Sequence, residues 1–161
     1  MVSSSESPRK SPGIHYPPPL IFVIGFGLGG LINRWLPISL GIGESKIVGV
    51  VAIAIAVVGV SLTGISIIIF LKNRTPVYPN SPARKLVVTG PYRFTRNPMY
   101  TGLTLLYLGG TLMVNSLWPL VMLPAVLFSI YRLVIVREEK HLHDTFGNAY
   151  GDYTSKVRRW I

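Results

Sequence analysis

The sequence predicts an all-α fold: a polytopic membrane protein with about four transmembrane helices and a C-terminal interfacial amphipathic helix. Three observations predict it. Of the 161 residues, 49% are hydrophobic and only 14% are charged, a composition too apolar for an ordinary soluble domain. The apolar residues gather in four runs, and the basic residues gather in the polar segments beside these runs, as is typical of membrane proteins.

The four apolar runs predict the transmembrane helices in chain order: residues 20–40, 47–71, about 99–114 and 117–136. A helix that rises about 1.5 Å per residue needs roughly 20 residues to cross about 30 Å of hydrocarbon, so the third run is a little short. Only Asn115 and Ser116 separate the third run from the fourth. These two helices are therefore expected to form a tight hairpin.

The predicted domain organisation is a short tail followed by one domain. Residues 1–19 are rich in Ser and Pro and lack an apolar segment, which predicts a disordered cytosolic tail and no cleaved signal peptide. Residues 20–161 are expected to form a single membrane-embedded domain. The chain has no cysteine, which excludes disulfides, thiolate metal sites and cysteine nucleophiles.

The distribution of charge predicts the orientation in the membrane. The net charge is +10, and thirteen of the sixteen Lys and Arg residues precede the first run, lie between the second and third runs, or follow the fourth. The positive-inside rule then places both termini and the long central loop in the cytosol, for a multi-pass protein of a prokaryotic inner membrane. Basic residues beside apolar runs indicate attraction to anionic membrane lipids and not to nucleic acid.

After the last apolar run, the sequence predicts an amphipathic helix on the membrane surface. Its apolar stripe consists of five residues at helical spacing: Leu142, Phe146, Tyr150, Tyr153 and Val157. Gly147 and Gly151 each weaken this helix by up to about 1 kcal/mol, so a break in the helix at these glycines remains an alternative. We expect Arg158, Arg159 and Trp160 to anchor the end of the helix in the lipid headgroups.

The segment 90–102, Gly-Pro-Tyr-Arg-Phe-Thr-Arg-Asn-Pro-Met-Tyr-Thr-Gly, is the first candidate site. Its irregular backbone would leave amides unpaired in hydrocarbon, so we expect it to line a polar pocket at the membrane face. Pro98 suits the first turn of the third helix. The exposed amides of that turn, with Arg93 and Arg96 just before it, predict a site for a carboxylate or phosphate. The alternative is that both arginines only contact lipid headgroups.

The second candidate site is the polar cluster Arg137-Glu138-Glu139-Lys140-His141. One interpretation is a solvated group of ion pairs, worth about 0–1 kcal/mol. The other is a set of acceptors for the hydroxyls or the amine of a cationic cofactor. Neighbouring residues point about 100° apart on a helix, so only one of Glu138 and Glu139 is expected to face a pocket.

Other motifs indicate packing or nothing specific. The glycines of Gly25-Phe-Gly-Leu-Gly-Gly30 have the spacing of a dinucleotide fingerprint, but they lie inside an apolar run, which favours close helix packing. His141 and His143 face different ways on a helix, so no metal site is predicted. The sequence does not indicate a Ser-His-Asp triad, and no catalytic residue is assigned.

Three motifs occur in order over roughly residues 82–161: Gly-Pro-Tyr-Arg-x-x-Arg-Asn-Pro-Met-Tyr-x-Gly, then Arg-Glu-Glu-x-x-Leu, then Phe-Gly-x-x-Tyr-x-x-Tyr. This half of the chain resembles the isoprenylcysteine carboxyl methyltransferase family, in the style of its small prokaryotic members. The wider group includes phospholipid methyltransferases. Eukaryotic members commonly have His where this chain has Asn97, and Asn cannot shuttle a proton.

The resemblance implies a cofactor, S-adenosylmethionine, held at the cytosolic face between the two polar clusters. It implies cofactor binding by nine residues: Tyr92, Arg96, Asn97, Pro98, Tyr100, Gly102, Glu138, Glu139 and Leu142. We assign Arg96 and Asn97 to the cofactor's carboxylate and Glu139 to the opposite wall, as acceptor for the ribose or the amine.

The expected function is methyl transfer from S-adenosylmethionine to a lipophilic or small acceptor that enters from the bilayer, with an isoprenylcysteine-type carboxylate favoured by the resemblance. Such a displacement on an activated carbon needs alignment of donor and acceptor more than a protein nucleophile. Two alternatives remain open. One is an NADPH-dependent membrane reductase of the sterol-reductase type, which shares part of the first motif, and the other is a non-catalytic membrane protein.

Overall fold

The computed structural model describes residues 17–42, 45–76, 83 and 85–160. Within these residues the chain is helical, without a strand and with one isolated bridge between Ser39 and Ser116, so the predicted all-α class is confirmed there. The elements follow in chain order: α1 (Pro18–Trp35), α2 (Lys46–Lys72), the 3-10 turn η1 (Gly90–Arg93), α3 (Pro98–Val114), α4 (Leu117–Ile130), the π-helical segment η2 (Tyr131–Ile135), α5 (Val136–Phe146) and α6 (Asn148–Lys156).

Local sequence explains where the helices begin and end. α1 begins at Pro18, inside the predicted tail, of which residues 1–16 lie outside the described residues. It ends at Trp35, earlier than the apolar run predicts, because Leu36 precedes Pro37 and a residue before proline disfavours helical geometry. Asn115 ends α3 in the left-handed conformation at φ 46°, and α4 begins two residues later, as the predicted tight hairpin requires.

Two helices are long and apolar enough to cross a membrane: α2, and the continuous helix Leu117–Phe146 that contains α4, η2 and α5. Large apolar side chains such as Val50, Val57 and Ile68 are exposed along α2. An apolar surface of this extent is unsuited to water. α1 and α3, with 18 and 17 residues, are shorter than the usual span.

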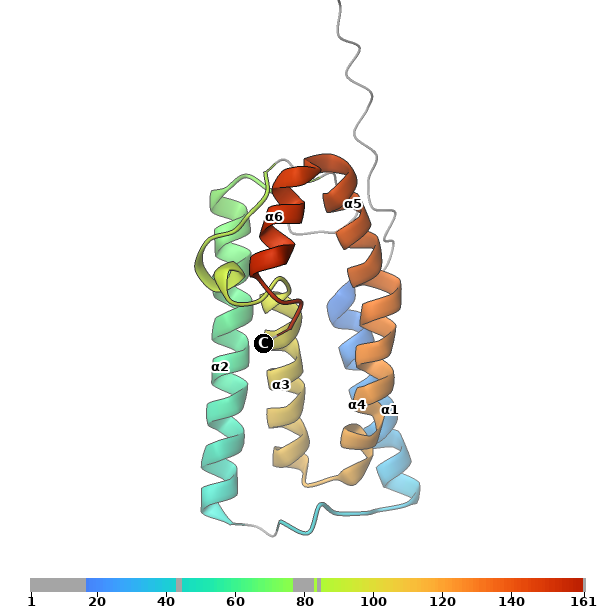
Figure 1. Cartoon of the computed structure of the whole chain (residues 1–161). Coiled ribbons are helices and arrows are strands. Elements are labelled where there is room, and N and C mark those ends of the chain that lie inside the picture. Colours follow the sequence, from blue (N-terminus) through green and yellow to red (C-terminus); the bar gives the residue numbers. More distant parts are fainter. Residues whose placement is uncertain (1–16, 43–44, 77–82, 84, 161) are drawn as a thin grey trace, which may run out of the picture.

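The four long helices pack as two pairs, α2 with α3 and α1 with α4 (Figure 1). Glycines allow both contacts. A Cβ atom on Gly102 of α3 would lie 2.6 Å from the carbonyl oxygen of Gly59 in α2, and one on Gly29 of α1 would lie 2.7 Å from the backbone of Pro119 in α4. Small residues let helix backbones approach closely in a membrane. Gly29 therefore serves packing, as predicted for the glycine-rich stretch of α1.

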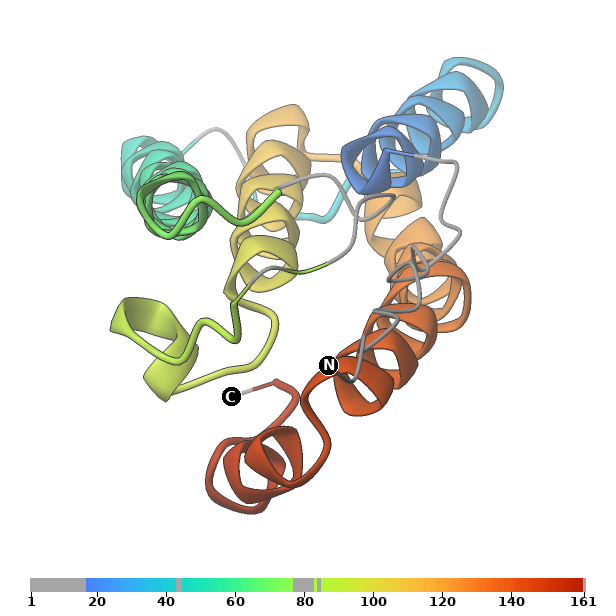
Figure 2. The same ribbon diagram turned by 90° about the horizontal axis from the view of Figure 1, so that it is seen from above.

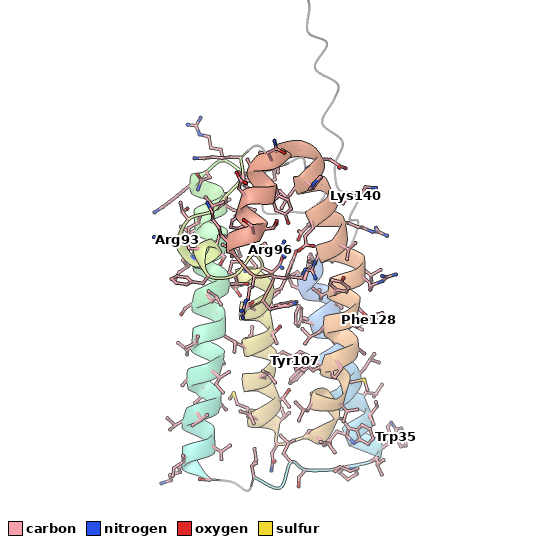
Figure 3. The ribbon with its side chains drawn as sticks, viewed as in Figure 1. Trp35, Arg93, Arg96, Tyr107, Phe128 and Lys140 are labelled. Carbon is pink, nitrogen blue, oxygen red and sulfur yellow. The ribbon has the colours of Figure 1, made fainter. Side chains whose placement is uncertain are left out.

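A buried cluster joins the pairs along the middle of the bundle. It includes Phe22 of α1, Tyr107 of α3 and Val126 of α4, and the ring of Phe26 meets that of Tyr107 edge to face at 5.2 Å. The hydroxyl group of Tyr107 donates to the carbonyl oxygen of Pro119 at 2.8 Å, so its polar atom is satisfied inside the core (Figure 3).

The C-terminal region differs from the single surface helix that the sequence predicts. The helix of α4 continues through η2 into α5, and the chain then breaks at Gly147, whose φ is +49°. α6 folds back from there, and the segment after it returns to the start of α3 (Figures 1 and 2). Tyr150, expected on a lipid-facing stripe, is buried with 4% exposure. The break occurs at the predicted glycine, but α6 covers protein.

Candidate functional site

A pocket lies at the end of the bundle where η1, the start of α3, α5 and α6 meet, with an empty volume of about 920 Å³ that includes its opening to solvent. Its wall is mixed. Lys85, Arg96, Glu138 and Glu139 supply charge, and Tyr92, Tyr100, Tyr150 and Tyr153 supply phenol groups. The apolar part consists mainly of Phe70, Leu86, Val87, Met99 and Leu142. A pocket with this mixture of charged, phenolic and apolar groups suits a small organic ligand with a few polar groups.

The backbone before α3 is held by the C-terminal segment. The amide of Arg96 donates to the carbonyl oxygen of Arg158 at 2.9 Å, and Asn97 Nδ2 and Thr95 Oγ1 donate to that of Arg159 at 3.1 and 3.0 Å. Asn97 is the N-cap residue of α3, with Pro98 in the first turn as predicted. Its side chain, however, binds the C-terminal segment and makes no capping hydrogen bond.

Arg96 presents a donor without a partner. Its side chain is 16% exposed, and one terminal nitrogen lies 3.3 Å from Glu139 Oε1 and 3.5 Å from the hydroxyl oxygen of Tyr150. Its Nε is buried and has no hydrogen-bond partner among the described residues. A buried donor left unpaired is costly, so this nitrogen suits an anionic group of a ligand. Arg93, by contrast, is exposed and points outward, away from the pocket (Figure 3).

Glu138 and Glu139 both line the pocket, although helical geometry suggested that only one would. Both carboxylates can line the pocket because each is bound by a different part of the chain. Tyr100 in α3 donates to Glu138 Oε1 at 2.9 Å. Arg159 in the C-terminal segment donates to both oxygens of Glu139, at 2.9 and 2.7 Å. Glu139 is thus already bound by arginine, and Glu138 is the better placed acceptor for a ligand.

Arg159 and Trp160 do not anchor the chain in headgroups as expected. Besides its pair of bonds to Glu139, Arg159 lies over the ring of Tyr131 at 5.1 Å, and Trp160 packs against the buried cluster. The hydrogen bonds to Glu139 raise the pKa of Arg159 above its ordinary value. The reason is that α6 turns the chain back over the site, so these residues meet protein. Arg158 alone is exposed.

Neutral phenol groups line the side of the pocket next to η1. The hydroxyl group of Tyr153 donates to the carbonyl oxygen of Tyr92 at 2.7 Å and so joins α6 to η1. Burial raises the pKa of Tyr153 to about 12 and also raises the pKa of Tyr92 and Tyr150. These groups keep their protons at physiological pH, where they can donate and accept hydrogen bonds.

The structure brings together eight of the nine residues singled out in the sequence; Gly102 does not line the pocket. Gly102 contacts α2, and a Cβ atom there would lie 2.9 Å from the amide nitrogen of Thr63, so it serves packing. Sequence reasoning missed Phe70, Leu86 and Val87, which carry no motif. It treated Tyr150 and Tyr153 as a lipid-facing stripe, although their place in the third motif was a usable signal.

The donor set fits an amino-acid-bearing nucleoside better than a metal. The described residues contain no group of three His, Cys, Asp or Glu side chains placed to hold a metal ion. The unpaired Arg96 Nε suits a carboxylate, and Glu138 suits hydroxyl or ammonium donors. The apolar wall suits a flat base. These observations agree with the cofactor that the resemblance implies.

Comparison with known proteins supports the motif-based assignment. The family model for phospholipid methyltransferases matches residues 45–149, about two thirds of the chain. This region contains α2, α3, α4 and α5 and therefore most of the pocket. No curated protein matches the chain. The family and the apolar helices together assign the protein to the membrane. The resemblance seen in the sequence is confirmed at the level of the family: the chain belongs to the phospholipid methyltransferase family.

Proposed function

We propose that the protein transfers a methyl group from S-adenosylmethionine to a lipophilic acceptor at the cytosolic face of the membrane. One observation carries the proposal. Within a phospholipid methyltransferase family member, a single pocket collects a partly unpaired arginine, a carboxylate and an apolar wall. These are complementary to the carboxylate, the amine or ribose, and the base of that cofactor.

Three groups of residues would hold the cofactor. Arg96 lines the pocket, has an unpaired Nε and would bind the carboxylate. Glu138, oriented by the Tyr100 hydroxyl group at 2.9 Å, would accept from the amine or the ribose hydroxyls. Phe70 and Leu86 lie in the apolar part of the wall and would contact the adenine. The bound cofactor supplies a sulfonium-activated methyl carbon.

The chain's own contribution is orientation and exclusion of water. Aligning donor and acceptor in a shielded site accounts for most of the acceleration that such a displacement needs. Lys85, Thr75 and His141 also line the pocket, but displacement on the sulfonium-activated carbon needs no nucleophile from the protein. A carboxylate acceptor of the isoprenylcysteine type needs no base, so it is the simplest acceptor for this site.

The proposed topology has four membrane-spanning helices, with the pocket and both termini on the cytosolic side. Two observations support it. Most of the described basic residues, including Arg93, Arg96 and Lys140, lie at the pocket end of the bundle, as the positive-inside rule requires for a cytosolic end (Figure 3). Helices of 18 and 17 residues extend about 27 and 26 Å, which spans a thin bilayer or a standard one with local thinning.

Calorimetric titration of the full chain, purified in detergent, tests the function. We expect S-adenosylmethionine and S-adenosylhomocysteine to bind with Kd values of about 1 µM or tighter, which corresponds to about −8 kcal/mol, and NADPH not to bind. Binding of NADPH without either adenosyl compound would transfer the assignment to the reductase. Binding of none of the three would leave a non-catalytic member of the family.

A further inference from the structure

Glu139 is contacted by two arginines, and their contacts are unequal. Arg159 uses Nε and a terminal nitrogen to bind both carboxylate oxygens at 2.9 and 2.7 Å, the strong fork geometry. Arg96 reaches Glu139 Oε1 with one nitrogen at 3.3 Å. Two guanidinium groups and one carboxylate carry a net charge of +1. Glu139 therefore satisfies Arg159 and leaves Arg96 incompletely paired.

Arg159 is fixed from outside the pocket. Its carbonyl oxygen accepts from Thr95 and Asn97, and its guanidinium lies over the ring of Tyr131 at 5.1 Å. It does not line the pocket, whereas Arg96 and Glu139 do. Arg159 is thus hydrogen-bonded to the pocket wall through Glu139, and its charge also acts on Tyr150.

We propose that Arg159 is a positioning residue that occupies Glu139 and thereby keeps Arg96 available for the carboxylate of the ligand. This inference rests on the proposed function. Without Arg159, the nearest described cation to Glu139 is Arg96, already at 3.3 Å. The freed carboxylate would form the full ion pair with Arg96 and compete with the carboxylate of the ligand. Affinity would fall although no group that touches the ligand had been removed.

The test compares S-adenosylmethionine with its decarboxylated form, which keeps the sulfonium, the amine and the adenosine. We expect Arg159→Gln to weaken binding of S-adenosylmethionine by about 10-fold or more, the effect of losing a charged hydrogen bond. Binding of the decarboxylated compound should change by less than about 3-fold, below 1 kcal/mol. A merely structural loss of the C-terminal segment would weaken both ligands equally, and that outcome would overturn the proposal.

A double variant separates competition from distortion. In Arg159→Gln/Glu139→Gln the competing carboxylate is absent, so the affinity for S-adenosylmethionine should return to within about 3-fold of Glu139→Gln alone. Additive losses would overturn the proposal. Arg158→Gln is the matched control, because its side chain is exposed beside Arg159, and it should bind both ligands like the parent.

The two proposals fail in different ways. If the parent protein binds neither S-adenosylmethionine nor S-adenosylhomocysteine, the proposed function is wrong. If the parent binds S-adenosylmethionine and Arg159→Gln changes the affinities for S-adenosylmethionine and its decarboxylated form by the same factor, the function stands and the proposed role of Arg159 is wrong. Thermal unfolding of each variant identifies any that fails to fold, and Arg159→Lys, which keeps the charge, then provides the folded comparison with intermediate affinity.

Discussion

The two ends of the helix bundle are closed by different kinds of contact. At the end away from the pocket, backbone groups join the α1–α2 connection to the α3–α4 turn: the amide of Leu117 donates to the carbonyl oxygen of Ile38, and the amide of Leu40 donates to that of Asn115. At the pocket end, side chains make most of the connections, as between Arg159 and Glu139 or Tyr100 and Glu138. Backbone contacts tolerate many sequences, whereas side-chain contacts specify particular residues. This difference places chemical specificity at the pocket end.

The surroundings of the side chains differ in the same way. At the far end, Trp35 is 82% exposed beside apolar residues such as Leu36. At the pocket end, charged groups are partly buried against one another, with 16% exposure for the side chain of Arg96 and 19% for that of Glu139. Keeping charges in such surroundings costs free energy unless they are paired or bind a ligand. We therefore expect substitutions at the two ends to separate binding from stability.

The largest expected effect is at Arg96. Arg96→Ala removes the cation with the unpaired Nε, and loss of a charged hydrogen-bond partner costs about 1.5–3 kcal/mol, or roughly 10- to 150-fold in affinity. Titration with S-adenosylhomocysteine measures the loss. Arg93→Ala is the control from the same segment, because Arg93 is exposed and outside the pocket, and its affinity should match the parent. Equal losses in both variants would contradict the assignment of Arg96.

The second prediction separates packing from binding within α3. In Gly102→Ala the new methyl group would lie 2.6 Å from the Gly59 carbonyl oxygen, and such overpacking costs about 1–3 kcal/mol. We expect a lower thermal midpoint in detergent with an unchanged Kd for the folded protein. Gly64→Ala on α2 is the control, since nothing lies within 4 Å of its added Cβ, and it should not lower the midpoint. A lower affinity for the ligand with an unchanged thermal midpoint would show that Gly102 belongs to the binding site.

Sequence reasoning identified eight residues of the pocket because they lie in two compact motifs. Pro98 marked the start of α3, and the polar segments could not face lipid, so a pocket between them followed from local rules. The assignment of Gly102 was different, because it came from membership of a motif, and a motif does not show which way a residue faces.

The C-terminal region escaped prediction because its partners are distant in the chain. An apolar period shows that a helix has a buried face but does not distinguish lipid from protein as its cover. Tyr153 contacts Tyr92, 61 residues away, and Arg159 contacts Glu139, 20 residues away. A 3.6-residue period does not predict the η2 segment either. Its π-helical turn changes the direction in which every later residue of the helix points. Tertiary contacts decide the positions of Tyr153 and Arg159.

The smallest expected effect is at the far end of the bundle. Trp118 Nε1 donates to the carbonyl oxygen of Leu36 at 2.6 Å and joins the end of α1 to the start of α4. Trp118→Phe keeps most of the ring but removes the donor, which should cost about 0.5–1.5 kcal/mol because the bond is exposed and water can replace it.

A modest fall in the thermal midpoint with an unchanged affinity for S-adenosylhomocysteine would support the division between the two ends. Trp35→Phe controls for loss of an indole at the same end, because Trp35 is 82% exposed, and it should unfold like the parent (Figure 3). If Trp118→Phe instead weakened ligand binding as strongly as Arg96→Ala, the two ends would be coupled through the helices. The far end would then help to shape the pocket, since α4 continues unbroken into α5, which carries Glu138 and Glu139.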